Sequence, residues 1–281
     1  MTVRIVTDSV SDLPTQVVQE LGISVVPLNV TFGRETYRDG VDMTTEQFYQ
    51  RLVKSKTLPV TSVPSQVAFT EIYDKLAEET DEILVITLSA KLSATNEVAS
   101  QSIKLMRNKC RVEVIDSEWA VMAQGFIAIT AARAAQAGAS LDEVRDIALR
   151  NRSRVNMRAA FDTLEYLKRG GRIGRASALL GSILKINPLI TINDGEIEPA
   201  GRTRSRARAI DNLVNFVMEY ANIEGIAVED ASCPDEADNL VERLSSRFPK
   251  EQIYRSRTTP VIGTHTGPGI LVVTVLGDKL E

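Results

Sequence analysis

The sequence predicts an α/β protein of two domains. In the first half of the chain, short apolar strands alternate with helical segments, a pattern typical of parallel βαβ units with helices on both faces of a sheet. In the second half, a strand enters a hairpin turn at Asn193-Asp194-Gly195, which indicates an α+β domain with a mixed sheet. With 43% hydrophobic and 25% charged residues, the chain can bury a sizeable core and does not resemble a disordered protein. We therefore expect a Rossmann-like domain over residues 1–155 and a mixed-sheet domain over residues 156–281.

Side chains that can cap helices mark where the helices of the first half begin. Thr44 and Gln47 have the spacing of a capping box, in which each side chain accepts a hydrogen bond from the backbone amide of the other residue. Ser140 and Glu143 repeat that spacing, and Asp12, just ahead of a proline, is a candidate cap for the first helix. The elements expected in this half are, in order, strands Val3–Thr7 and Ile23–Val30, helices Glu46–Val53 and Gln66–Glu78, strand Glu82–Leu88, helix Ser93–Arg107, strand Val112–Ile115, helix Met122–Ala137 and a helix that ends near Arg154.

The second half contains short helices and strands in place of that regular alternation. Two adjacent glycines, Gly170 and Gly171, are expected to stop a short helix because glycine is a poor helix former. The elements expected in this half are, in order, helices Leu164–Arg169 and Ala176–Leu184, strand Leu189–Ile192, helix Ala207–Tyr220, strand Gly225–Val228, helix Glu236–Phe248 and two strands that flank His265.

Membrane and secretion signals are lacking in the sequence. No apolar run reaches the ~18 residues that a membrane-spanning helix needs, and Met1–Val6 leads directly into a strand without the regions of a signal peptide. The two cysteines, Cys110 and Cys233, lie far apart and outside any Cys-x-x-Cys motif, which fits a reducing compartment. We therefore expect a cytoplasmic protein.

Charge is unevenly distributed along the chain. Residues 1–100 carry 14 acidic and 8 basic side chains, whereas residues 145–208 carry 6 acidic and 14 basic ones. The basic segment is densest at four alternating positions, Arg202, Arg204, Arg206 and Arg208. Alternation would place these arginines on one face of a strand, although a solvated helix start explains them equally well. A basic segment indicates an anionic ligand or partner, but the net charge of −4 and the lack of interleaved aromatic residues argue against nucleic acid.

His265 is the only histidine, and it precedes the glycine- and proline-rich string Thr266–Gly269. One imidazole and two distant cysteines exclude a histidine cluster for a metal, so we expect neither a metal nor a cofactor. A turn of this composition can hold an imidazole against a ligand. The alternative is a ring that packs under the turn with both nitrogens satisfied.

Three loops rich in hydroxyl groups follow predicted strands, where ligands bind in parallel α/β sheets. They are Thr7–Asp12, Thr61–Ser65 and Leu88–Asn96. In the third loop, Ser93 stands where a helix is expected to begin, so its hydroxyl and the unpaired backbone amides favour an anion. The alternatives are Ser93 as a simple helix cap and Thr61 as an ordinary turn residue.

Several strings of the chain occur in a characteristic order and spacing. They are Thr7-Asp8-Ser9, Thr61-Ser62-x-Pro64-Ser65, Leu92-Ser93-x-Thr95, Asp116-Ser117, the run Leu164–Gly174 with its Gly-Gly-Arg-Ile-Gly, and His265-Thr266-Gly267-Pro268-Gly269. Over about Val3 to Gly277 this series resembles the DegV family, and the Gly-Gly-Arg-Ile-Gly and His-Thr-Gly-Pro-Gly strings in this order are highly specific.

The resemblance implies a bacterial fatty-acid-binding protein that holds its lipid between two α/β domains. Some members of the family are binding subunits of a fatty acid kinase, and they present the acyl carboxylate to a separate, ATP-using catalytic subunit that makes acyl phosphate. The partners implied for this chain are thus a long-chain fatty acid and a kinase catalytic subunit, with transient proximity to a membrane. The resemblance implies no catalysis by the chain itself.

The same resemblance implies which residues hold the ligand. The groups implied around the carboxylate are Thr61, Ser62, Ser93, His265 and a backbone amide of Ala94 or Thr95. Arg172 and Arg202 would belong to the head-group region or to the surface that faces the partner. Two or three such donors are enough, since each charge-assisted hydrogen bond offsets roughly 1.5–3 kcal/mol of the cost of burying a carboxylate.

Three positions depart from the family pattern. Ala94 stands where relatives usually have glycine, Asn96 where they have tyrosine, and Val63 where a glutamine is common. If position 94 requires a positive φ, alanine costs about 1 kcal/mol or shifts the loop. If position 94 does not require a positive φ, the methyl group of Ala94 would instead narrow the head-group pocket.

One enzymatic alternative remains, an esterase or acyl transferase with Ser93 as nucleophile and His265 as base. Ser93 lacks the Gly-x-Ser-x-Gly elbow, and no acidic neighbour in the sequence orients His265. A dinucleotide enzyme fits less well, because Gly170–Gly174 follows a helical stretch and not a strand.

Overall fold

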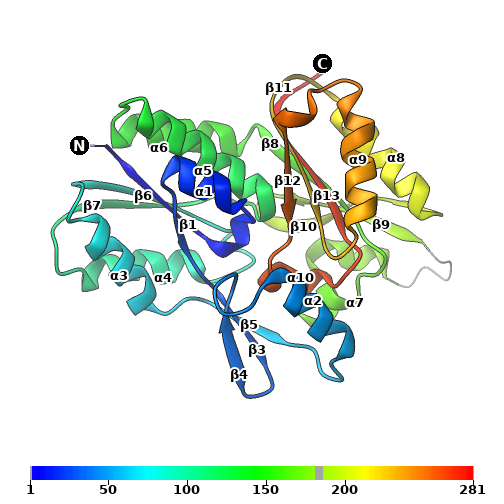
Figure 1. The fold of residues 1–281 in the computed structure, drawn as a ribbon, viewed down its shortest axis with the longest axis horizontal. Helices are drawn as coiled ribbons and strands as arrows, with labels where there is room; N and C mark the ends of the chain where they lie inside the picture. Colours follow the sequence, from blue (N-terminus) through cyan, green and yellow to red (C-terminus); the bar gives the residue numbers. More distant parts are fainter. Residues whose placement is uncertain (1, 181–185, 281) are drawn as a thin grey trace.

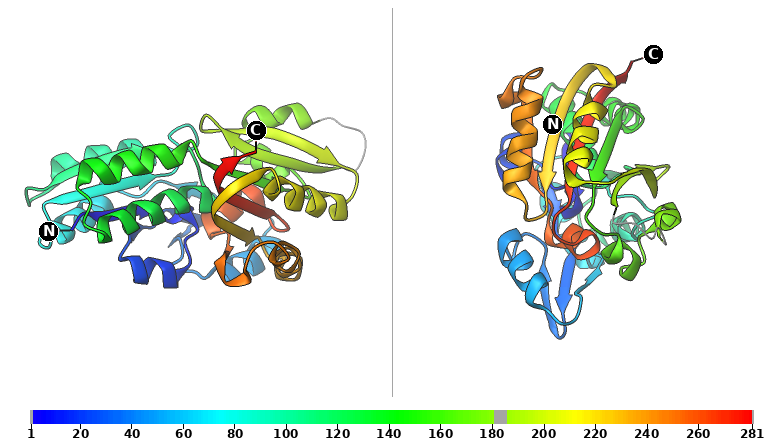
Figure 2. Two further views of the ribbon diagram at one scale, coloured as in Figure 1. Left: turned by 90° about the horizontal axis from the view of Figure 1, so that it is seen from above. Right: turned by 90° about the vertical axis from the view of Figure 1, so that its right-hand side faces the viewer.

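Two sheets lie side by side along the longest axis of the molecule, and a small third sheet lies beneath them (Figures 1 and 2). The structure is a computed structural model that describes residues 2–180 and 186–280. The first large sheet comes from the first half of the chain and the second from the remainder. The predicted two-domain α/β fold is confirmed, while the exact division at residues 155 and 156 stays a prediction.

The first sheet is parallel throughout, as predicted. Its strands, in spatial order, are β2 (Ser24–Val26), β1 (Arg4–Asp8), β6 (Glu82–Thr87) and β7 (Arg111–Asp116). Helices α3 (Gln66–Leu76) and α4 (Thr95–Ser102) cover one face, and α5 (Val121–Gln136) and α6 (Leu141–Arg152) cover the other (Figure 1). Alternate side chains of β6 therefore enter different cores, because successive residues of a strand point to opposite faces.

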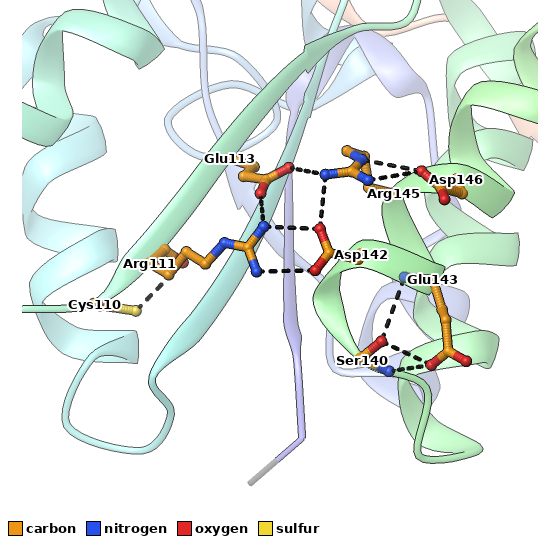
Figure 3. Close-up of polar contacts among 8 residues, drawn as sticks. All are labelled: Cys110, Arg111, Glu113, Ser140, Asp142, Glu143, Arg145 and Asp146. Atoms are coloured by element: carbon orange, nitrogen blue, oxygen red, sulfur yellow. Dashed lines mark hydrogen bonds and ion pairs between the residues drawn. The ribbon is translucent and has the colours of Figure 1, made fainter.

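Strand β7 forms an edge of this sheet, and ion pairs connect it to α6 (Figure 3). Arg111 of β7 donates two hydrogen bonds to Asp142, at 2.8 and 3.2 Å, and Arg145 bridges Asp142 and Glu113 at 2.8 and 3.2 Å. The predicted capping box at the start of α6 is present, since the amide and hydroxyl of Ser140 both donate to the Glu143 carboxylate. These charged pairs thus hold α6 against the face of the sheet at its edge strand.

The second sheet is mixed, as predicted. Its strands, in spatial order, are β10 (Glu196–Thr203), β9 (Asn187–Asn193), β8 (Val155–Ala160), β13 (Leu271–Lys279), β11 (Tyr220–Asp230) and β12 (Ile253–Arg257). Neighbours are antiparallel except for β11 and β12. Helices α8 (Arg206–Val217) and α9 (Pro234–Ser245) cover one face, and the opposite face joins the core that α5 shares with the first sheet.

The third sheet is antiparallel and lies below the other two (Figure 1). It consists of β4 (Glu35–Arg38), β3 (Asn29–Phe32) and β5 (Val60–Ser62). Around it lie α2 (Thr45–Lys54), with the predicted Thr44/Gln47 capping box, and α10 (Pro260–Thr266), which also contacts α7 (Glu165–Arg169). The C-terminal part of the chain thereby returns to the first half.

Several sequence expectations are corrected by the structure. The single strand expected over Ile23–Val30 is two strands in different sheets, β2 and β3, because Pro27 lies between them. Asp12 does not cap α1 (Thr15–Leu21), whose N-cap is Pro14; the Asp12 carboxylate instead accepts a hydrogen bond from the Thr259 amide at 3.0 Å. The helix expected over Ser93–Arg107 is α4 followed by a 3-10 turn over Ile103–Leu105.

The remaining differences lie in the second half. Strand β8 was not predicted, whereas the hairpin turn expected at Asn193-Asp194-Gly195 is present and joins β9 to β10. The four alternating arginines do not share one strand face, because Arg202 is on β10 whereas Arg206 and Arg208 are in α8. Of the helix expected over Ala176–Leu184, the described part is a 3-10 helix over Gly174–Leu179, and residues 181–184 lie outside the described residues. Within residues 2–180 and 186–280, no helix is both long and apolar enough to cross a membrane.

Candidate functional site

An apolar cavity lies between the first and second sheets, and both halves of the chain line it. It encloses about 790 Å³ of atom-free space, including the part open to solvent. The lining residues from the first half are Val10, Leu28, Thr61, Leu88, Leu92, Ser93, Ala120 and Val121, and those from the second half are Met157, Ala159, Phe161, Leu167, Arg172, Ile190, Ile192, Ile197, Val261, Ile262, His265, Thr266, Ile270 and Val272. Few of these side chains are polar, so the cavity suits a largely apolar molecule.

The floor of the cavity is the face of the second sheet opposite α8 and α9. Met157, Ala159 and Phe161 follow one another along this face of β8 and its end, at every second position. Ala159 pairs with Ile190 of β9 and with Val272 of β13, so the floor continues sideways across neighbouring strands. The side chain of Ala159 is small, which leaves room at the middle of the floor.

Polar groups gather at one end of this floor. From Phe161 the chain continues toward α7 and Arg172, and α10, which carries His265, leads into the start of β13. At this end, Thr61 Oγ1 lies 2.8 Å from His265 Nε2. Thr61 and His265 therefore contribute to a polar end of the cavity.

The sequence had indicated that His265 lies on the glycine- and proline-rich turn. In the structure it lies in the last turn of helix α10. The turn follows the helix, where Gly267 and Gly269 have φ values of 72° and 84°. Burial, and to a lesser degree the positive charge of Arg172, lower the pKa of His265 to about 4. The imidazole is therefore neutral at neutral pH.

The second ring nitrogen of His265 faces Gly170. Nδ1 is buried and has no hydrogen-bond partner in the part of the chain that the structure describes. A Cβ atom at position 170 would come closer to Nδ1 than real Cβ atoms approach other atoms, so only glycine lets the ring occupy this position. The Gly-Gly-Arg string thus makes room for the histidine.

Arg172 connects the polar residues of the two halves. Its guanidinium donates to the Gly170 carbonyl at 2.8 Å and, across the cavity mouth, to the Leu92 carbonyl at 3.3 Å. The next residue, Ser93, lines the cavity, and its hydroxyl lies 2.8 Å from Thr95 Oγ1. Thr61, Ser93, Arg172 and His265 therefore surround one end of the cavity, although four separate elements or loops supply them.

A second hollow lies outside this polar end, and we call it the vestibule. It is lined by Lys56, Thr57, Leu58, Pro59, Val60, Thr61, Arg169, Gly170, Arg172, Thr264 and His265. Thr61, Arg172 and His265 line both the vestibule and the cavity. The vestibule carries the cationic side chains of Lys56, Arg169 and Arg172, of which Arg169 is paired with Glu165 at 2.6 Å, so Lys56 and Arg172 chiefly favour an anion next to the cavity mouth.

Four of the residues considered for the ligand site do not line the cavity. Ser62 is exposed on β5, where alternation turns it away from its neighbour Thr61. Ala94 is exposed at the start of α4, and Thr95 is buried behind Ser93. Arg202 is exposed on the edge strand β10 and lines neither the cavity nor the vestibule.

Two of the departures from the family pattern have a structural explanation. The φ of Ala94 is −76°, which alanine adopts without strain. Glycine would have been required only if this φ were positive. Asn96 donates a hydrogen bond at 3.0 Å to the hydroxyl of Thr87 beneath the loop. Val63 contributes its carbonyl, which accepts a bond from Asn29 at 3.3 Å.

Val121 is a cavity residue that the sequence analysis missed. It is β-branched, buried and the first residue of α5, yet its φ is 54°, a conformation that such residues rarely adopt. The backbone is held on both sides, since the Ser89 amide donates to the Trp119 carbonyl at 2.8 Å and the Met122 amide donates to the Glu229 carboxylate at 3.2 Å. The conformational propensity of valine gives no sign of such a backbone conformation, because tertiary contacts impose it.

Buried carboxyl groups connect the two halves near this wall. Asp12 and Asp39 of the first half accept hydrogen bonds from the amides of Thr259 and Val261, at 3.0 and 3.3 Å. Burial raises the pKa of Asp39 to about 7 and that of Glu229 to about 8, and burial and the nearby Glu229 raise the pKa of Asp12 well above its usual value. These groups lie outside the cavity lining, and we assign them to holding the halves together.

The geometry defines a two-domain α/β protein with an enclosed apolar site that has hydrogen-bonding groups at one end, an arrangement suited to an amphipathic molecule. In the described residues no group of three or more His, Cys, Asp or Glu side chains could hold a metal ion. Residues 2–278 match the family model described as "Uncharacterised protein, DegV family". The chain therefore belongs to the DegV family.

Relatives and solved structures agree with this assignment. The chain is 38% identical over 277 residues to a DegV domain-containing protein of Streptomyces coelicolor, covering 97% of this chain and 98% of that one. It is 33% identical over 279 residues to the protein DegV of Bacillus subtilis, covering 96% and 98%. A structure titled as fatty acid binding of a DegV family protein from Thermus thermophilus superposes with a TM-score of 0.91 at 32% identity, covering 99% and 100%. The structure of DegV from Bacillus subtilis, described as a fatty acid binding protein, gives 0.90 at 30%, also covering 99% and 100%.

Proposed function

We propose that this protein binds a long-chain fatty acid in the cavity, which acts as a tunnel between the two domains. The carboxylate of the fatty acid lies at the polar end. The observation that carries the proposal is the polarity of the cavity: Thr61, Ser93, Arg172 and His265 at one end, and aliphatic side chains along the floor. Solved DegV structures described as fatty acid binding, at 32% and 30% identity, support the same ligand class.

The head group is selected by hydrogen bonds. With its proton on Nε2, the neutral His265 ring donates to Thr61 Oγ1, so the threonine hydroxyl hydrogen is free to donate to a carboxylate oxygen. This tautomer leaves Nδ1 as a bare acceptor, which is less costly to bury without a partner than an N–H group. The Ser93 hydroxyl and the Arg172 guanidinium supply further donors, while Ser62, Ala94, Thr95 and Arg202 have no direct part in this arrangement.

The acyl chain supplies most of the binding free energy. At ~0.8 kcal/mol per buried methylene, a chain of about 14 methylenes contributes on the order of 11 kcal/mol before the cost of association. The floor accommodates such a chain because it exposes no polar side chain between Phe161 and Met157. In this assignment the head-group residues orient the ligand, and the tail determines most of its affinity.

We further propose that the protein presents the carboxylate to a separate kinase subunit and is not itself a catalyst. A carboxylate oxygen would attack the γ-phosphorus of the partner's ATP, so that an O–P bond forms, the bond to ADP breaks and acyl phosphate results. The vestibule supports this role, because Lys56, Arg169 and Arg172 can neutralise charge on the transferred phosphoryl group outside the cavity mouth.

The esterase alternative has less support. In the described residues, the Ser93 hydroxyl is hydrogen-bonded to Thr95 and not to His265. Of the two ring nitrogens of His265, Nε2 is hydrogen-bonded to Thr61 and Nδ1 faces Gly170. Among residues 2–180 and 186–280, no carboxylate orients the imidazole, as a nucleophile–base pair would require.

Mass spectrometry of lipid extracted from the purified protein tests the proposal. We expect a fatty acid in near-stoichiometric amount, and its loss in the double variant Thr61→Val/His265→Phe, which removes head-group donors and keeps similar volume. A wild-type protein that carries no fatty acid and takes none up from solution would contradict the binding role. Addition of a DegV-associated kinase subunit and ATP to the loaded protein then tests acyl phosphate formation separately.

A further inference from the structure

The loop between β6 and α4 carries Ser93, and a buried serine near its start, Ser89, shapes it. The carbonyl of Ser89 accepts hydrogen bonds from the amides of Leu92 and Ser93, at 3.0 and 3.1 Å. Its hydroxyl oxygen accepts another from the Lys91 amide at 3.2 Å. The main chain from Ser89 to Ser93 is therefore a tight turn, and the place of the Ser93 hydroxyl depends on Ser89.

The hydroxyl hydrogen of Ser89 is donated outside this turn, to the second half of the chain. Ser89 Oγ donates to the Gly195 carbonyl at 2.7 Å, in the hairpin that joins β9 to β10. Gly195 and its neighbour Asp194 both have positive φ values, 75° and 47°, as a two-residue hairpin of this kind requires. The predicted hairpin turn thus presents a carbonyl oxygen to the loop that carries Ser93.

The hairpin and the loop approach each other closely. A Cβ atom at position 195 would lie 2.7 Å from Ser89 Oγ, so a larger residue there would displace the hydroxyl from the carbonyl. A second bond also reaches this loop from the second half, since the Arg172 guanidinium donates to the Leu92 carbonyl at 3.3 Å. The second half therefore holds the Ser93 loop at two points, although the loop belongs to the first half.

We propose that Ser89 is a positioning residue for the head-group site. By joining the Ser93 loop to the β9–β10 hairpin, it holds the Ser93 hydroxyl where the carboxylate of the ligand binds. This inference rests on the proposed fatty acid binding, in which Ser93 is one of the donors. Ser89 does not line the cavity, so its effect on binding passes through Ser93. The head-group donors are thereby coupled to the contact between the two halves.

Ser117 provides a matched control, because it is a buried serine whose hydroxyl bonds stay within its own loop. It directly follows β7, the neighbour of β6, and its hydroxyl oxygen accepts a bond from the Trp119 amide at 3.1 Å, two residues on. Its hydroxyl donates to the Trp119 carbonyl at 3.2 Å. Ser117→Ala therefore removes the same atoms as Ser89→Ala from a neighbouring loop, but it breaks no bond between the halves.

A double-mutant cycle tests the assignment. The affinity for palmitic or oleic acid, whichever binds wild-type protein more tightly, is measured by competition with a fluorescent fatty acid. We expect Ser89→Ala to weaken binding about three- to tenfold, as for the loss of one hydrogen bond of ordinary strength. In the Ser93→Ala background the same substitution should have no effect, because the hydroxyl that Ser89 places is already absent. Ser117→Ala should leave the affinity unchanged.

Gly195→Ala disrupts the same bond from the hairpin side, and it keeps the test decisive if Ser89→Ala does not fold. It should lower the affinity to a similar extent, again only when Ser93 is present. Gly33→Ala is its control, because Gly33 has a φ of 63° in the hairpin between β3 and β4 and a Cβ atom there meets nothing within 4 Å. Both variants strain the backbone in a similar way, but only Gly195→Ala displaces the Ser89 hydroxyl.

The outcomes separate this inference from the proposed function. If wild-type protein binds no fatty acid, the proposed function fails and the inference fails with it. If wild-type protein binds fatty acid but folded Ser89→Ala or Gly195→Ala keeps the wild-type affinity, the positioning role is overturned and the binding role stands. An undiminished loss in the Ser93→Ala background, or an equal loss in the control variants Ser117→Ala and Gly33→Ala, would also overturn it, because the effect would not pass through Ser93.

Discussion

Thr61 Oγ1 and His265 Nε2 lie 2.8 Å apart, although 204 residues separate them in the sequence. Thr61 belongs to a three-stranded sheet of the first half, and His265 belongs to a helix between two strands of the second-half sheet. The contact therefore joins the two halves at the cavity mouth. Any displacement of the imidazole should be measurable as a change in ligand affinity.

Gly170→Ala should displace that imidazole. The new methyl group would meet His265 Nδ1, while the backbone at position 170 tolerates alanine because its φ is −74°. We expect fatty acid affinity to fall at least tenfold, about 1.4 kcal/mol, measured by competition binding.

Gly171→Ala is the control for this prediction. Its φ of 69° makes alanine cost about 1 kcal/mol of stability. No atom lies within 4 Å of the added carbon, so affinity should not change. Equal losses of affinity in both variants would show that general destabilisation, and not the position of His265, was responsible.

The histidine should remain neutral over the physiological range. Burial lowers its pKa to about 4, so the ring signals of the single histidine should not titrate between about pH 8 and pH 5 in NMR spectra of the unliganded protein. A bound carboxylate favours the charged ring, and fatty acid should therefore raise this pKa. A titration midpoint near 6.5 without ligand would contradict the buried, partnerless position of Nδ1.

Stability should depend on pH through Glu229. Burial raises its pKa from 4.5 to about 8, so the folded state keeps a proton that the unfolded state loses. This contribution is fully present below about pH 4.5 and disappears as pH rises through about 8. His265 acts in the opposite direction, since its lowered pKa reduces stability as pH falls from 6.5 to about 4.

A comparison of variants isolates the contribution of Glu229. Glu229→Gln removes the titrating group and keeps an oxygen to accept the bond from the Met122 amide. The thermal midpoint of the wild-type protein should fall more steeply between pH 5 and pH 8 than that of the variant, as measured by calorimetry. Parallel curves for the two proteins would mean that Glu229 does not titrate in this range.

Charge reversal in the vestibule should affect the partner reaction alone. Lys56 is exposed and lines the vestibule but not the cavity, so Lys56→Glu should leave fatty acid bound. We expect kinase-dependent acyl phosphate formation to fall several-fold, with a weaker dependence on salt than in the wild-type protein. Lys104→Glu makes the same charge change at an exposed site outside the vestibule, and an equal effect there would exclude a specific role for Lys56.

Local signals in the sequence were sufficient for many elements. The capping boxes at Thr44 and Ser140 predicted the starts of α2 and α6, because each depends only on residues three positions apart. Strand β8 was missed although Val155–Ala159 alternates apolar and polar residues, because the segment is short and the strand is specified by pairing with β13 more than 110 residues later. Sequence spacing likewise could not show that Ser62 turns away from the cavity.

The family pattern pointed to four residues that line the cavity, Thr61, Ser93, Arg172 and His265, yet it did not reveal how they are connected. Arg172 was expected near the head group, and the structure places it across the mouth, bonded to the Leu92 carbonyl. Arg202 was expected in the head-group region or on the surface that faces a partner, and its exposed position on the edge strand β10 fits only the second of these. Side-chain direction depends on strand register and crossing loops, which a single sequence does not encode in any short pattern.

The left-handed backbone of Val121 has a consequence for ligand entry. A β-branched residue in this conformation stores on the order of 1–3 kcal/mol of strain, which hydrogen bonds to Trp119 and Met122 hold in place. The wall around Val121 is thus already rigid before a ligand arrives, and binding there entails little loss of backbone entropy. A backbone held in this way favours ligands whose shape already fits the wall at Val121.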